Sequence, residues 1–137
     1  MAVVSELIKK GADGGLEFGD YSLDSKSKLS DFEYGGDLYK IKTFKEITKL
    51  ERNELFVYES EPGTAVHGFK SDSDGVSFTV EGDADAQITL ELEPESGYEI
   101  TIGDGETASM KTNLGGKLTF SVELSGNDAV PVSVRKA

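Results

Sequence analysis

The sequence contains no cysteine and no tryptophan, and His67 is the only histidine among its 137 residues. Without cysteine the chain can form no disulfide, no thiolate metal site and no cysteine nucleophile. With one histidine it cannot build a multi-histidine zinc or iron centre by itself. Any metal would therefore be bound through oxygen ligands or a single imidazole. We expect His67 itself to be a half-buried structural residue.

Basic residues are scarce, with 14 Lys and Arg against 26 Asp and Glu, and the net charge is −12. The imbalance is greatest in residues 61–137, where 5 basic residues face 14 acidic ones. Such a surface repels phosphate backbones and anionic lipid headgroups. We therefore expect neither nucleic acid nor membrane as a partner.

Long apolar runs are absent too, since no stretch approaches the roughly 18 residues of a membrane-spanning helix. The N-terminal segment has no basic leader before an apolar run of signal-peptide length. Together with the lack of cysteine, these features predict a cytoplasmic protein.

Three runs in the C-terminal half, 86–92, 98–102 and 117–124, have an apolar side chain at every second position. This period of two is typical of paired strands with one buried face. Further strands are expected at 64–69, 76–81, 108–112 and 130–134, the last in an edge position because Pro131 cannot donate a ladder hydrogen bond. Seven short strands with regular turns predict a β-sandwich over residues 63–137.

The first 62 residues predict a smaller β-rich portion that ends at the turn Pro62-Gly63. Val3, Val4, Leu7 and Ile8 have helical spacing, which predicts one short N-terminal helix over residues 3–10. A hairpin is expected around Gly35-Gly36, because glycine takes the positive φ angles of a tight turn without strain. Residues 44–51 fit either a helix or a strand.

Residues 92–102 resemble the corner between strands E and F of fibronectin type III and other immunoglobulin-like domains. The shared features are Leu92, Pro94 and Tyr98, followed by the alternating run 98–102. The resemblance implies an immunoglobulin-like sandwich and says nothing about function. The core tryptophan usual in that family is missing.

The whole chain also resembles a family of short acidic proteins from anaerobic Gram-positive bacteria, some labelled endosialidase. The resemblance rests on residues 37–46, 56–60, 62–67 and 110–117. A sialidase binds the sialate carboxylate with three arginines, whereas this chain has only Arg52 and Arg135. Residues 71–78 do not complete an aspartate box either, since Ser73 stands where that motif needs Asp.

Asp72, Asp74 and Glu81 have part of the spacing of a calcium-binding loop, with Gly75 at the tight turn. Lys70 occupies the first ligand position, however, and residues 76–80 alternate as a strand. The segment is therefore interpreted as an acidic β-turn, with a Ca²⁺ site as the alternative. A second candidate cluster combines Asp83 and Asp85 with the acidic residues 104 and 106.

Aromatic residues give the functional hint, because 7 of the 12 lie in residues 21–58 of the N-terminal portion. Rings on a sheet either form its core or contact a sugar or protein partner. We predict a non-catalytic binding or assembly module that contacts a protein partner, a second copy or a glycan through Tyr34, Tyr39, Phe56 and Tyr58. The alternatives are a carbohydrate-active hydrolase that uses a carboxylate pair and a calcium-stabilised structural domain. No catalytic residue is assigned.

Overall fold

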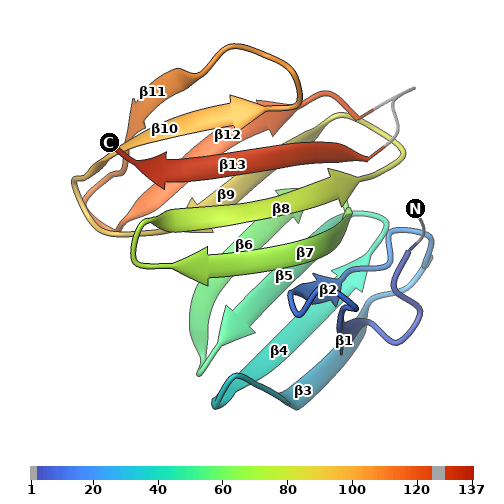
Figure 1. Ribbon diagram of the computed structural model, residues 1–137. Coiled ribbons are helices and arrows are strands. Elements are labelled where there is room, and N and C mark those ends of the chain that lie inside the picture. Colours follow the sequence, from blue (N-terminus) through green and yellow to red (C-terminus); the bar gives the residue numbers. More distant parts are fainter. Residues whose placement is uncertain (1–2, 125–128) are drawn as a thin grey trace.

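The computed structural model describes residues 3–124 and 129–137, which form strands in two antiparallel sheets (Figure 1). The 7-stranded sheet has the order β1-β2-β7-β8-β13-β10-β11. Its members are β1 (Ile8–Lys10), β2 (Leu16–Phe18), β7 (Ala65–Asp72), β8 (Gly75–Glu81), β13 (Val130–Lys136), β10 (Gly97–Ile102) and β11 (Ala108–Lys111). The 6-stranded sheet has the order β12-β9-β6-β5-β4-β3. Its members are β12 (Lys117–Val122), β9 (Ala86–Glu91), β6 (Leu55–Glu61), β5 (Ile47–Arg52), β4 (Asp37–Phe44) and β3 (Ser27–Tyr34).

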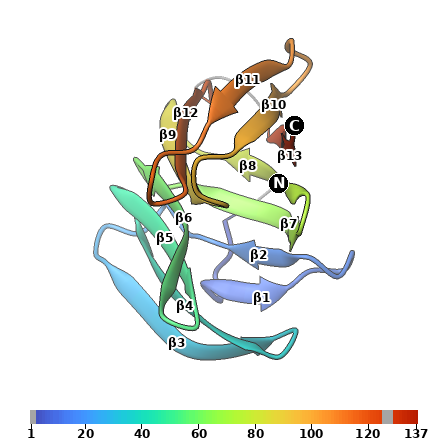
Figure 2. The ribbon, with the colours of Figure 1, turned by 90° about the vertical axis from the view of Figure 1, so that its left-hand side faces the viewer.

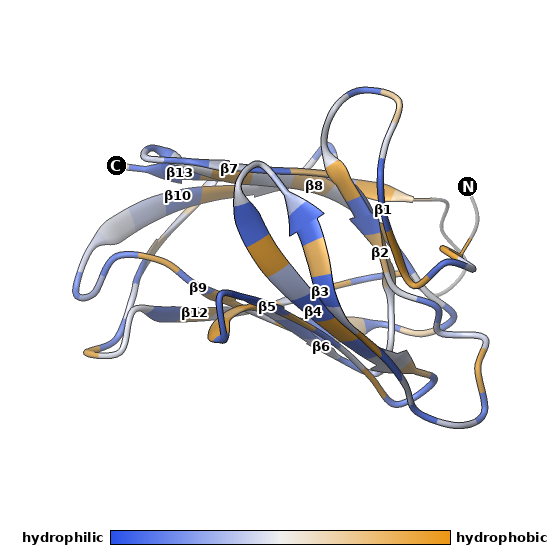
Figure 3. Cartoon of the chain, turned by 90° about the horizontal axis from the view of Figure 1, so that it is seen from below, coloured by the Kyte–Doolittle hydropathy of each residue, from blue (hydrophilic) through white to orange (hydrophobic). Residues whose placement is uncertain are grey.

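The two sheets form two layers (Figures 2 and 3). The buried apolar side chains of both sheets form one core cluster. Alternation along each strand explains the buried set, because every second side chain of a strand points to the same face. In β9, for example, Ile88 and Leu90 are buried while Gln87 is exposed. The expected mainly β fold with antiparallel layers is confirmed, and Ile100, Phe120 and Val122 are buried.

The predicted N-terminal helix is wrong, because the described residues contain no helix and residues 8–10 form strand β1. Leu7 has a φ angle of 72°, which a right-handed helix does not allow. The chain turns back through residues 11–15, so that Ile8 pairs with Phe18 of β2. A helix of about eight residues is too short to be stable alone, whereas a paired strand satisfies its backbone groups.

The hairpin predicted at Gly35-Gly36 is confirmed, since Tyr34 pairs with Asp37 across that turn. The two glycines have φ angles of 59° and 85°, as a type I′ turn requires. Residues 44–51, which fitted either a helix or a strand, are strand from Ile47 onward. Ile47 pairs with Phe44 of the preceding strand.

All seven strands predicted beyond Pro62 are present, but Pro131 does not lie in an edge strand. It is the second residue of β13, which lies between β8 and β10. Proline is tolerated near the start of a strand, where its missing N–H removes few of the hydrogen bonds between strands. Its carbonyl accepts a hydrogen bond of 2.7 Å from the backbone N–H of Gly103.

Both sheets combine strands from either side of Pro62, since β2 pairs with β7 and β6 pairs with β9. A chain of hydrogen-bonded, buried hydroxyl groups joins the sheets where the polypeptide passes from β6 to β7. Thr48 Oγ1 lies 2.8 Å from Thr43 Oγ1 and donates to the carbonyl of Thr64 at 2.8 Å. Thr64 Oγ1 in turn lies 2.8 Å from the hydroxyls of Tyr58 and Ser60. These polar groups are buried because each finds a partner in the others.

Within residues 3–124 and 129–137, no helix of the length and hydropathy needed to cross a membrane is present.

Candidate functional site

Arg52 is the last residue of β5 and lies at one open end of the two layers. Thr48 and Leu50 point into the core, and strand alternation places Arg52 on this same face. Its neighbours across the sheet are Tyr39 and Leu55. Because Arg52 stands at the end of the strand, its side chain is exposed although it points inward.

Two adjoining hollows flank Arg52, and together we call them the Arg52 groove. The larger has a volume of about 290 Å³, the smaller about 250 Å³, and they share Arg52, Phe69 and Ser71. The groove therefore lies between β5 of one sheet and β7 of the other. Its wall in the larger hollow includes Leu55, Phe56, Asp72 and Tyr98, and in the smaller hollow Tyr34, Tyr39 and Lys70.

The structure brings Tyr34 and Tyr39 together in the smaller hollow. Their rings meet edge to face with centroids 5.9 Å apart. The Tyr34 hydroxyl donates a hydrogen bond to the carbonyl of Gly14, which ties the β1–β2 loop to the β3–β4 hairpin. Burial raises the pKa of Tyr39, and the nearby Arg52 acts in the opposite direction. Tyr39 and Arg52 are direct neighbours across β4 and β5.

Phe56 is displaced from the core by a β-bulge. Leu50 pairs with Tyr58 and Glu51 pairs with Phe56, so Val57 is the extra residue of β6. A bulge shifts the alternation by one residue, and Phe56 joins Glu51 on the outer face of the sheet. Two ammonium groups lie over its ring, at 5.9 Å for Lys49 and 4.7 Å for Lys117. Phe56 therefore borders the groove from outside the core.

Tyr58 lies in the core and has no exposed surface (0%). Its ring meets those of Phe18, Phe69 and Phe78 edge to face. Burial raises the pKa of its hydroxyl well above the ordinary range. A partner could reach Tyr58 only if the two sheets opened. In this respect Tyr58 differs from Tyr34, Tyr39 and Phe56, the other three aromatic residues predicted to contact a ligand.

The Arg52 guanidinium has no carboxylate within ion-pair distance among the residues that the structure describes. By contrast, Arg135 lies 3.4 Å from Asp72. Beside Arg52, Leu55 is 67% exposed at the tip of the β5–β6 hairpin. An unpaired cation next to an exposed aliphatic side chain and aromatic rings can bind an oxyanion and an apolar surface together.

The structure does not bring Asp72, Asp74 and Glu81 together. Asp72 and Asp74 lie in the β7–β8 turn, whereas Glu81 ends β8, roughly 20 Å away at about 3.3 Å per residue. Asp85 of the second acidic cluster caps the backbone N–H of Leu124 at 2.9 Å. Across residues 3–124 and 129–137, no three His, Cys, Asp or Glu side chains are arranged to hold a metal ion.

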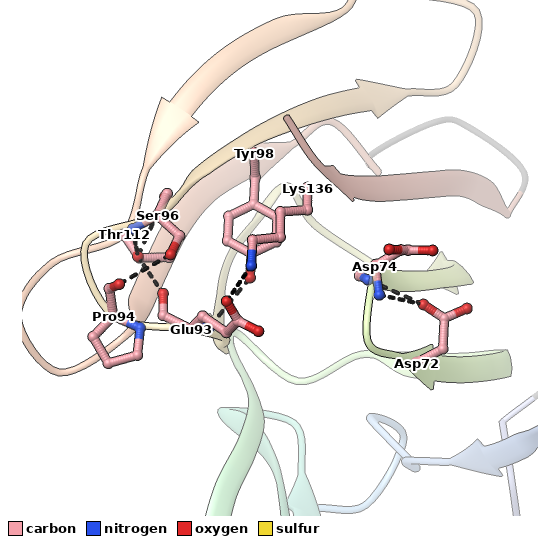
Figure 4. A network of polar contacts seen from close by, with 9 residues as sticks. Asp72, Asp74, Glu93, Pro94, Ser96, Tyr98, Thr112 and Lys136 are labelled. Carbon is pink, nitrogen blue, oxygen red and sulfur yellow. Dashed lines mark hydrogen bonds and ion pairs between the residues drawn. The ribbon is translucent and has the colours of Figure 1, made fainter.

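The β7–β8 turn explains what Asp72 does instead (Figure 4). Its carboxylate accepts hydrogen bonds from the backbone N–H of Asp74 at 2.8 Å and of Gly75 at 3.1 Å. The hydrogen bond from Asp74 is the main cause that lowers the pKa of Asp72, and Arg135 adds to it. The interpretation of this segment as an acidic turn agrees with these contacts.

We expect the Asp72 carboxyl to titrate below the exposed aspartates in a ¹³C NMR pH titration. In the variant Arg135→Gln its pKa should rise only in part, because the backbone N–H of Asp74 still stabilises the ionised form. Since the pKa is lower in the folded state, the associated stability is present at neutral pH. It is lost as the pH falls through the folded-state value. An Asp72 pKa at or above the ordinary value of an aspartate would contradict this contact.

Tyr98 forms the corner that the sequence suggested (Figure 4). Its hydroxyl accepts a hydrogen bond of 3.2 Å from the backbone N–H of Glu93, and its ring is buried. Glu93 also pairs with Lys136 of β13. These contacts fix the 92–97 segment along one side of the larger hollow.

His67 joins β7 to the strands on both sides. Its Nδ1 lies 3.0 Å from Glu17 of β2, and its Nε2 lies 3.6 Å from Glu81 of β8. The side chain is only 12% exposed, as expected of a structural histidine. Nε2 is too far from Glu81 for a hydrogen bond.

Sequence reasoning missed Arg52, the central residue of the groove, because residues 44–51 before it fitted either a helix or a strand. The alternation of Thr48 and Leu50 would have placed Arg52 on the inner face, once residues 47–52 were assigned to a strand. Nothing in the sequence indicated that β7 would lie across from it.

Comparison of the chain with protein-family models, with curated proteins and with solved structures finds no match.

Proposed function

We propose that the protein is a non-catalytic binding module that takes up its ligand in the Arg52 groove. The observation that carries this proposal is the exposed, unpaired guanidinium of Arg52 between two adjoining hollows. An exposed guanidinium with no carboxylate partner keeps its hydrogen-bond donors free for an anionic ligand.

The groove fits a ligand that presents an oxyanion beside an apolar or ring surface. The guanidinium can make paired hydrogen bonds with a carboxylate, a sulfate or a phosphate. Leu55 and the ring of Tyr34 offer apolar surface on either side. Such a ligand can be a protein segment or an acidic glycan, which are the partners expected from the aromatic content.

The contact residues in this proposal are Tyr34, Arg52, Leu55 and Phe56. Tyr39 lies directly beside Arg52 on the neighbouring strand. Tyr58 is left out because it is fully buried.

Arg52→Gln should weaken binding of any ligand that wild-type protein captures from a panel of acidic glycans and carboxylate-bearing peptides. The loss of a charge-assisted hydrogen bond predicts a drop in affinity of about tenfold or more. Calorimetry on the captured ligand measures the change. The side chain is exposed, so we expect the thermal unfolding of the variant to stay close to that of wild type.

Lys111→Gln is the matched control, since it removes one positive charge from an exposed residue that does not line the groove. Affinity should be unchanged in that variant. Ligands that bind Arg52→Gln and Leu55→Ser as tightly as wild type would place the binding surface elsewhere. Release of a cleaved product from a captured ligand would overturn the non-catalytic assignment.

We also propose that residues 63–137 form an immunoglobulin-like or fibronectin type III-like sandwich. The Tyr98 corner supports it. The position of β13 between β8 and β10 departs from it. In an immunoglobulin domain the last strand lies in the sheet that does not contain the first two strands, whereas β13 shares a sheet with β7 and β8.

A further inference from the structure

Three lysines stand directly side by side across the outer face of the 6-stranded sheet. Lys28 of β3 pairs with Lys42 of β4, and Lys42 pairs with Lys49 of β5. Directly opposed residues of neighbouring strands point to the same face. Lys42 and Lys49 each lie between two buried residues of their strands, so this face is the outer one.

Lys26 adds a fourth positive charge at the start of the same row. Its ammonium lies 5.7 Å from the centre of the Phe44 ring. Burial lowers the pKa of Lys42, and repulsion from Lys26, Lys49 and Lys28 lowers it further, whereas Glu59 acts in the opposite direction. We call these four residues, Lys26, Lys28, Lys42 and Lys49, the lysine face.

This arrangement disfavours folding, because like charges directly opposite each other in a sheet are destabilising. The neighbouring row shows the usual solution, with Lys40 opposite Glu51. Among the described residues, no carboxylate lies within ion-pair distance of the lysine face. Glu59 lies opposite Lys49 at the end of this row, so four cations share one neighbouring carboxylate. This local excess of positive charge, in a chain of net charge −12, favours an anionic partner.

The chain itself carries a matching surface at its other end. Asp104 and Glu106 are exposed in the β10–β11 turn, two residues apart. Neither forms an ion pair with any residue that the structure describes. Three other acidic residues in turns have partners by contrast: Asp72 pairs with Arg135, Glu93 with Lys136, and Asp85 caps Leu124. Figures 1 and 2 both show the β10–β11 turn at the upper end and β3–β5 at the lower end.

We propose that the lysine face binds the β10–β11 turn of a second copy of this chain, so that copies associate head to tail. The two surfaces differ and lie at opposite ends, hence each copy can bind one neighbour at either end. A heterologous contact of this kind builds short chains or a closed ring. The net charge of −12 opposes association only weakly at about 0.1 M salt, where the Debye length is about 10 Å.

Sedimentation velocity at about 0.1 M salt tests the proposal. The mass should rise above the 14.7 kDa of one chain as the concentration increases from about 10 µM to about 1 mM. It should return to that of the monomer at about 1 M salt, where the Debye length is about 3 Å. Both Lys42→Glu/Lys49→Glu and Asp104→Lys/Glu106→Lys should remain monomeric, since each removes one of the two surfaces.

An equimolar mixture of these two variants is the decisive sample. Each retains the surface that the other has lost, and the two reversed surfaces are again opposite in charge, so the mixture should regain the association that each variant alone has lost. Lys10→Glu/Lys111→Glu changes the net charge as much as the lysine-face variant and should associate like wild type. Arg52→Gln should also associate normally, which separates this proposal from ligand binding in the Arg52 groove.

Wild-type protein that stays monomeric over the whole concentration range would overturn the proposal. So would a Lys42→Glu/Lys49→Glu variant that associates like wild type. A mixture of the two variants that stays monomeric would overturn the head-to-tail arrangement.

Discussion

Replacing Tyr58 with alanine is expected to lower the free energy of unfolding by about 3–5 kcal/mol, the usual cost of removing a large buried ring. Tyr58 belongs to β6, and the rings around it come from β2, β7 and β8 of the other sheet. The substitution would therefore leave a cavity between the two layers. Because small domains are stable by only about 5–15 kcal/mol, the loss is a large part of the total. Urea denaturation measures it.

Tyr58→Phe separates the ring from the hydroxyl. It keeps the aromatic contacts and removes only the hydrogen bond with Thr64, so a cost of about 1 kcal/mol is expected. If Tyr58→Ala cost less than about 1 kcal/mol, the ring could not lie in a packed core.

Thr48→Val should cost roughly 3 kcal/mol, although the two side chains have nearly the same shape. Thr48 Oγ1 accepts a hydrogen bond of 3.0 Å from the backbone N–H of Thr64 and donates one to the Thr64 carbonyl. Valine would leave both buried groups without this partner, and each unsatisfied group costs about 1–3 kcal/mol. Thermal unfolding and urea denaturation of the variant measure the loss.

Thr48→Ser is the matched control, because it keeps the hydroxyl and removes a methyl group. It should cost about 1 kcal/mol, less than valine. The opposite order would mean that the methyl packing, and not the hydroxyl chain, stabilises the crossing from β6 to β7.

Alternating side chains were the reliable signal for the fold. Runs such as 86–92 and 117–124 have one apolar face, and a strand with one apolar face can be stable only against another layer. The turn at Gly35-Gly36 was equally predictable, because few residues other than glycine accept two successive positive φ angles. Local chemistry was decisive in both cases.

Features that depend on distant partners could not be predicted in this way. Val4 and Ile8 are buried four residues apart, a spacing that mimics a helix, but β2 supplies the hydrogen bonds that make residues 8–10 a strand. The bulge at Val57 turns Phe56 outward while Tyr58 stays in the core. Simple alternation would place Phe56 and Tyr58, two residues apart, on the same face of the strand. Their different positions become clear only from the pairing of β6 with β5.

The candidate site was predictable only in outline. The aromatic content pointed to the N-terminal strands, and Tyr34 and Tyr39 do meet in the groove. Arg52 becomes a site residue only because β7, from the other half of the chain, closes the opposite wall. Such a pairing depends on sheet topology, which periodicity does not encode.

Chemical-shift mapping with N-acetyl-phenylalanine would test the central claim, binding in the Arg52 groove, most directly. This small probe combines a carboxylate with a ring. Added at millimolar concentration to ¹⁵N-labelled protein, it should shift the Arg52 side-chain Nε–H signal and the amide signals of Leu55 and Ser71. The shifts should saturate and should vanish in Arg52→Gln. Shifts that scatter over the outer faces of the sheets, or that persist in Arg52→Gln, would contradict the account.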